Sequence, residues 1–197
     1  MIDEAVPETR GASDGTPADR TASRTVAVWD LPLRLWHWAL AVSILAAWFT
    51  PTVYDTLHRI VGYTVLGLLA FRLVWGFWGS RYSRFRMVGI RLRVAPHYLW
   101  NLRRGMTGRY IGLNPAGTLM LVALLLAIAI SAITGAMSVT VTFFGLWWVE
   151  DTHAIASDAV IVLAVVHVLG VVLMGLLQRE NLIRAMFTGR KRIRHHQ

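Results

Sequence analysis

The sequence predicts an all-α membrane protein in which four transmembrane helices form a bundle. The chain has 197 residues, of which 55% are hydrophobic and 16% are charged, whereas soluble domains carry about 25% charged residues. Its mean hydropathy is +0.50. It also contains several uncharged stretches of the length that a helix needs to cross a bilayer core. These observations argue against both a disordered chain and an ordinary soluble domain.

The four spans are expected at about residues 31–50, 57–79, 115–138 and 153–178. Asp30 provides an N-cap for the first helix, and Pro32 suits its first turn. Asn114 and Pro115 open the third helix in the same way. The connection before the fourth helix is aromatic and β-branched, which is typical of a segment at the membrane interface.

The ends of the chain differ in composition from this membrane domain, which is expected at 28–192. Residues 1–27 are polar and lack the apolar stretch of a signal peptide. We expect them to form a disordered cytoplasmic extension. Residues 193–197 form a basic cytoplasmic tail.

The distribution of basic residues predicts the orientation in the membrane. Segment 79–113 carries eight arginines and no acid, and the chain after Gln178 is also basic. The connections before the second and fourth helices carry Asp55, and Glu150 with Asp151. The positive-inside rule then places both termini and the long basic segment in the cytoplasm. These arginines are expected to contact membrane lipid, and no nucleic-acid partner is expected.

The chain contains no cysteine. This excludes disulfides, thiolate metal sites, iron–sulfur clusters and covalent c-type haem attachment. Histidine is then the remaining good nitrogen ligand for a metal, and four histidines lie at membrane depth: His37, His58, His153 and His167. Ionisable groups at that depth mark functional sites, although a lone histidine can instead hydrogen-bond a neighbouring helix.

The spacing of these histidines places them in two pairs. His153 and His167 are separated by about 21 Å along one helix and by only about 40° around it. His58 begins the second helix at the periplasmic end, and His37 lies about two turns into the first helix from the cytoplasmic end. His58 therefore matches His153 in height, and His37 matches His167. Facing imidazoles at one height suit the two axial positions of a six-coordinate haem iron.

Other residues are candidates for contacts with such a cofactor. Arg72 follows His58 by fourteen positions, so it is expected on the same helix face at the height of the inner histidines. It either hydrogen-bonds a haem propionate or extends to the cytoplasmic headgroups. Arg59 is a similar candidate on the outer side. Gly62 and Gly170 would leave room for a flat porphyrin, although glycine also lets membrane helices pack closely.

Several segments resemble the bacterial di-haem cytochrome b561 family and the related hydrogenase-type b cytochromes. Residues 28–38, which include Trp-His37-Trp, resemble the first-helix signature. His58 to Gly62, continuing to Arg72-Leu-Val-Trp-Gly76, resembles the second helix. The His153–His167 spacing resembles the fourth helix, and the resemblance covers about 28–192. Leu113 departs from it, since many relatives have a histidine at this point before the third helix.

The resemblance implies two haem b groups in a protein of the bacterial inner membrane, with His37, His58, His153 and His167 as ligands. It implies electron transfer between a periplasmic partner and the quinone pool, with ubiquinone as a candidate ligand. Two redox alternatives are a superoxide:quinone oxidoreductase and the cytochrome b anchor subunit of a hydrogenase or dehydrogenase. A non-redox anchor or transporter would instead use Arg72, Asp158 and the histidines for packing or proton movement.

Overall fold

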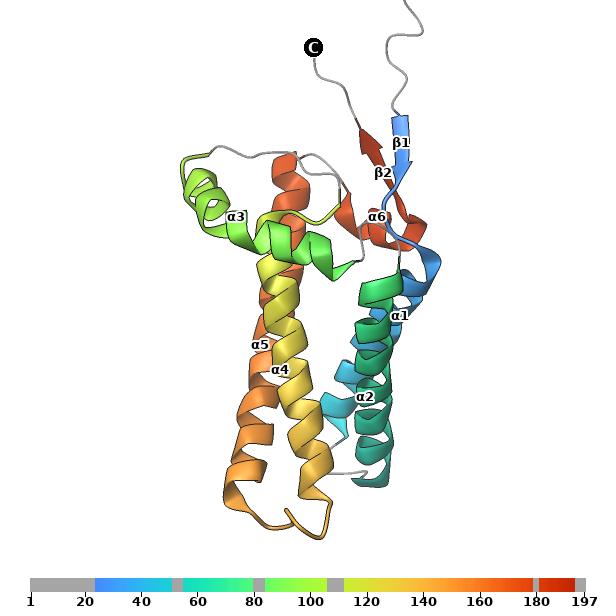
Figure 1. The fold of residues 1–197 in the computed structure, drawn as a ribbon, viewed down its shortest axis with the longest axis vertical. Helices are drawn as coiled ribbons and strands as arrows, with labels where there is room; N and C mark the ends of the chain where they lie inside the picture. Colours follow the sequence, from blue (N-terminus) through green and yellow to red (C-terminus); the bar gives the residue numbers. More distant parts are fainter. Residues whose placement is uncertain (1–23, 51–54, 80–83, 106–111, 179–180, 194–197) are drawn as a thin grey trace, which may run out of the picture.

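The computed structural model describes residues 24–50, 55–79, 84–105, 112–178 and 181–193. Most of the described chain is helical, and two short strands lie near its ends (Figure 1). In chain order the elements are β1 (Arg24–Ala27), α1 (Leu31–Phe49), α2 (Asp55–Trp78), α3 (Phe85–Arg103), α4 (Pro115–Ser138), α5 (Trp147–Gln178), α6 (Leu182–Thr188) and β2 (Arg190–Ile193).

Helices α1, α2, α4 and α5 form the bundle. Within the described ranges, these four helices are long and apolar enough to cross a membrane, which confirms the predicted fold class. Helix α1 packs along α2, α4 packs along α5, and α2 contacts α4, so the bundle consists of two joined hairpins (Figure 1). The buried core joins the hairpins through Leu33, Trp36, Leu40, Val65, Ile128 and Val160. Many other large apolar side chains are exposed on the helices, as expected where lipid is the solvent.

The predicted N-caps are confirmed. The Asp30 carboxylate accepts a hydrogen bond from the backbone N–H of Leu33 at 3.0 Å, at the start of α1. The Asn114 side chain accepts one from the N–H of Gly117 at 2.6 Å, at the start of α4. Each bond satisfies a donor that the first turn of a helix leaves without an intrahelical partner.

Helix α5 begins at Trp147, six residues before the predicted start at His153. Gly145 adopts a left-handed backbone conformation with φ of 71° and ends the preceding turns. Glu150 then lies in the first turn, where a negative charge is favourable near the helix N-terminus. A helix of 32 residues is about 48 Å long, so α5 extends beyond a hydrocarbon core of about 30 Å.

The two strands join the N-terminal and C-terminal segments at one end of the bundle (Figure 1). β1 pairs antiparallel with β2, with Arg24 opposite Ile193 and Ala27 opposite Arg190. Residues 24–27 therefore differ from the predicted disordered extension, while 1–23 and 194–197 lie outside the described residues. Gly189 ends α6 with φ of 74°, and its carbonyl accepts hydrogen bonds from the backbone N–H groups of Val28 and Trp29, which lie between β1 and α1.

Helix α3 lies within the long basic segment and crosses the bundle at the same end as the strands (Figure 1). It packs against α4 and buries Arg91, Ala95 and Tyr98. Its first residue, Phe85, lies on α2 at Gly76, where a Cβ atom would overlap the phenyl ring. The absence of a side chain at Gly76 therefore allows α3 to approach α2.

Candidate functional site

The structure brings the four membrane-depth histidines together in the two expected pairs. His58 of α2 and His153 of α5, here called the outer pair, have ring centroids 6.1 Å apart. His37 of α1 and His167 of α5, the inner pair, have ring centroids 6.4 Å apart. Each pair joins a helix of the first hairpin to α5 in the second hairpin.

Main-chain carbonyls hold both imidazoles of the outer pair. Nδ1 of His58 lies 3.0 Å from the carbonyl oxygen of Ala47, and Nδ1 of His153 lies 2.8 Å from that of Ser131. Because a carbonyl oxygen only accepts, Nδ1 is the protonated nitrogen in each ring. Nε2 then keeps its lone pair, as a metal-ligating imidazole requires.

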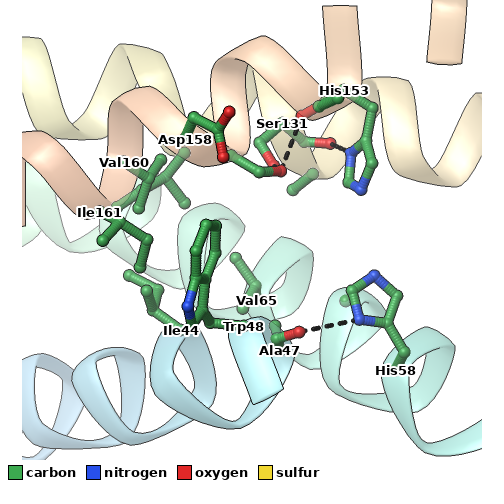
Figure 2. A pocket seen from close by; sticks show the side chains of 15 residues that line it. Ile44, Ala47, Trp48, His58, Val65, Ser131, His153, Asp158, Val160 and Ile161 are labelled. Atoms are coloured by element: carbon green, nitrogen blue, oxygen red, sulfur yellow. Dashed lines mark hydrogen bonds between the residues drawn. The ribbon is translucent and has the colours of Figure 1, made fainter. Parts of the chain in front are cut away.

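A cavity of about 340 Å³ contains the outer pair, and all four bundle helices line it. Figure 2 shows both imidazoles directed into this space from opposite sides. Gly62 is part of the lining, and a Cβ atom placed on it would have no neighbour within 4 Å. Asp158 lies in the wall formed by α5 (Figure 2). The cavity therefore has a mainly apolar lining, two imidazoles and a carboxylate.

The inner pair has different surroundings. Nδ1 of His37 is buried, and in the part of the chain that the structure describes it meets no hydrogen-bond partner. The ring of Trp38 packs edge-on against His37 at 5.3 Å between centroids. The carbonyl contacts that hold Nδ1 in the outer pair are therefore not repeated at His37.

Arg72 of α2 is buried beside Trp36, which precedes His37 of the inner pair on α1. Its guanidinium lies 5.7 Å from the ring centroid of Trp36, the neighbour of His37, and 5.0 Å from that of Phe85. Only 3% of the residue is exposed, so the side chain does not extend to the headgroups. Asp30 is close enough to interact with it electrostatically. Arg72 thus places a positive charge among aromatic rings at the inner end of the bundle.

Arg59 and Gly170 lie elsewhere. The Arg59 guanidinium forms an exposed ion pair with Asp55 at 3.0 Å, and Arg59 is not part of the cavity lining. Gly170 is exposed on α5, and a Cβ atom there would have no neighbour within 4 Å. The structure therefore brings neither residue into contact with a histidine pair.

Helix α4 contributes residues to the outer pair that sequence reasoning missed. The Ser131 carbonyl accepts the His153 hydrogen bond, and Gly135 lies directly against the same ring. These residues are four positions apart, so they share one face of α4. The sequence offers no signal that separates these two from the other small residues of this aliphatic span.

The arrangement defines a class: a helical membrane protein with histidine pairs across its bundle core. Among the described residues there is no group of three or more His, Cys, Asp or Glu side chains that could hold a metal ion. A pair supplies too few donors for a structural zinc site, which takes four. Two axial nitrogens are enough for haem iron, because the macrocycle supplies the other donors.

The chain belongs to the prokaryotic cytochrome b561 family, whose model matches residues 28–189. It is also similar to a protein of Rhodobacter capsulatus described as a probable Ni/Fe-hydrogenase B-type cytochrome subunit. The two are 25% identical over 238 aligned positions, which cover 96% of this chain and 91% of the relative. No solved structure gives a significant match. The protein is thus a multi-pass bacterial membrane cytochrome of the b type with a role in electron transfer.

Proposed function

We propose that this protein carries electrons across the membrane through two haem b groups, one held by His58 and His153 and the other by His37 and His167. The histidine spacing carries the proposal. Two imidazoles on opposite sides of one metal ion have centroids about 6.4 Å apart, since each metal–nitrogen bond is about 2 Å and each ring adds about 1.2 Å. The observed separations are 6.1 Å and 6.4 Å.

Two further observations support a fit to haem at the outer pair. The Nδ1 contacts of His58 and His153 leave Nε2 as the available ligand atom. The cavity and the open space at Gly62 provide room beside the imidazoles. Cysteine ligands are excluded because the sequence contains none.

The protein's own groups then have distinct tasks. Bound haem supplies a one-electron redox centre. The histidine pairs would hold the haem iron from both faces and leave it no open position, which would favour electron transfer over oxygen binding. The apolar helices exclude water, and the buried Arg72 guanidinium would donate charge-assisted hydrogen bonds to a haem propionate at the inner site.

The orientation follows from charge. The end that carries α3 and the strands is basic, so we place it, with both termini, in the cytoplasm. The opposite end has Asp55, Glu150 and Asp151 exposed, which favours a protein donor over a small anion such as superoxide. By analogy with the Rhodobacter relative, a hydrogenase or dehydrogenase subunit is the proposed periplasmic partner. Quinone, with ubiquinone as the candidate, is the proposed reaction partner in the membrane.

Haem quantification with a redox titration of the purified protein tests the proposal. We expect two haems per polypeptide, two one-electron components, and a sharp low-spin b-type α band after reduction with dithionite. A colourless folded protein, or one with high-spin haem, would refute it.

A further inference from the structure

The ring of His153 occupies space that only glycine leaves on α4. An ideal Cβ atom on Gly135 would lie 2.8 Å from Cε1 and 2.9 Å from Nδ1 of His153. Cβ atoms in proteins do not approach other atoms this closely, so a side chain at Gly135 would force the imidazole or the two helices to move. Because His153 belongs to the outer pair and lines the cavity, this contact affects the candidate site as well as the packing of α4 against α5.

One turn earlier on the same helix face, the Ser131 carbonyl accepts the hydrogen bond from Nδ1 of His153 at 2.8 Å. One side-chain contact joins the two helices at this level, and a second lies within α5. The hydroxyls of Ser131 and Ser157 are 2.8 Å apart, and the Ser157 hydroxyl donates to the His153 carbonyl at 2.7 Å. Both the tautomer and the position of the imidazole are thus determined by α4.

We propose that Gly135 and the Ser131 carbonyl form a seat for His153 and that Gly135 is a positioning residue for the outer haem ligand. This inference rests on the proposed function. The absence of a side chain at Gly135 lets the His153 ring lie against α4, and the carbonyl hydrogen bond raises the basicity of Nε2. A more basic ligand stabilises ferric iron, so the seat contributes to a low potential at the outer haem.

Gly67 offers a matched control. It is also a glycine within a membrane-spanning helix, it is exposed on α2, and a Cβ atom placed on it would have no neighbour within 4 Å. It does not line the cavity. Gly67→Ala therefore makes the same chemical change as Gly135→Ala without touching a histidine.

The test compares the two alanine variants with the wild-type haem-loaded protein in detergent. The readouts are haem per polypeptide, the potential of each haem, and the low-spin electron paramagnetic resonance signals. We expect Gly135→Ala either to lose one haem equivalent or to shift the potential of one haem upward and alter one of the two signals. The other haem stays unchanged, and Gly67→Ala matches the wild type.

The outcomes separate the two proposals. Wild-type potentials and signals in Gly135→Ala would overturn the seat while leaving the proposed function intact, whereas wild-type protein without haem would refute the proposed function itself. If Gly135→Ala does not accumulate, the double variant with His153→Ala decides, because the added methyl group then has room. The seat predicts that the yield of the double variant equals the yield of His153→Ala alone. A lower yield of the double variant would overturn the seat.

Discussion

Trp75 of α2 donates its indole N–H to Oδ2 of Asp30 at 3.1 Å. The other carboxylate oxygen of Asp30 accepts the hydrogen bond from Leu33 that caps α1. A single carboxylate therefore starts one membrane-spanning helix and ties it to the end of the next one. It does so at the end of the bundle where Arg72 is buried, so the same group also offsets a positive charge.

Replacing Asp30 is expected to destabilise the bundle at this end. Asp30→Ala removes the N-cap, which is worth about 1 kcal/mol, and leaves the Trp75 indole N–H without its acceptor. Asp30→Asn keeps an acceptor for the cap and should be affected less. Thermal unfolding in detergent, followed by circular dichroism, measures both. Equal melting temperatures for Asp30→Ala and the wild type would contradict the expectation.

His153→Ala is expected to retain one haem per polypeptide where the wild type has two. The outer haem is lost because His58 alone cannot supply both axial bonds, while the inner pair is left in place. Pyridine haemochrome quantification of purified protein gives the ratio.

His97→Ala is the control for this loss. His97 lies exposed on α3, and its ring contacts Asn101 at 3.0 Å. This variant should retain both haems. Two haems in His153→Ala would show that His153 is not a ligand.

The outer haem is expected to have the lower reduction potential. Carbonyl hydrogen bonds to both outer imidazoles make those ligands more basic, whereas the Arg72 charge near the inner pair favours reduced iron. Single-site variants allow the assignment: His37→Ala leaves the outer haem, and His153→Ala leaves the inner one. With this order, electron transfer from the outer haem to the inner haem is energetically downhill. A reduction potential of the outer haem above that of the inner haem would contradict it.

Arg72→Gln is expected to lower the potential of the inner haem. Removing a buried positive charge stabilises the oxidised form, and a change of several tens of millivolts is expected, where about 59 mV corresponds to a factor of ten in the equilibrium constant. Arg72→Lys keeps the charge and should shift the potential less. Redox titration in the His153→Ala background isolates the inner haem. An unchanged potential in Arg72→Gln would place the guanidinium outside the electrostatic reach of the iron.

The fold was largely predictable because its signals are local. Uncharged runs of sufficient length define the spans, and Asp30 and Asn114 mark helix starts through bonds that reach only three residues ahead. The start of α5 was predicted too late because turns ending at Gly145 let the helix begin at Trp147, within the stretch expected to be the interfacial connection. The pairing of β1 with β2 spans almost the whole chain, and no local pattern indicates it.

The histidine pairs were predictable because helix geometry converts sequence spacing into height and direction. The contacts that hold those rings were not. Ala47, Ser131 and Gly135 act through a carbonyl or through an absent side chain, and neither feature distinguishes them from other small residues in an apolar span. Their roles depend on how α1 and α4 rotate against neighbouring helices, which only the assembled bundle determines.

His153 and His167 belong to a single uninterrupted helix, and this limits how the two proposed haem sites can change. Inserting one residue between them would swing one imidazole by about 100° relative to the other, so neither site tolerates a shift in chain length there. A tilt of α5 would move the His153 and His167 rings together, because both belong to the same helix. The spacing between the centres is thereby set by the pitch of a helix rather than by the flexibility of a loop.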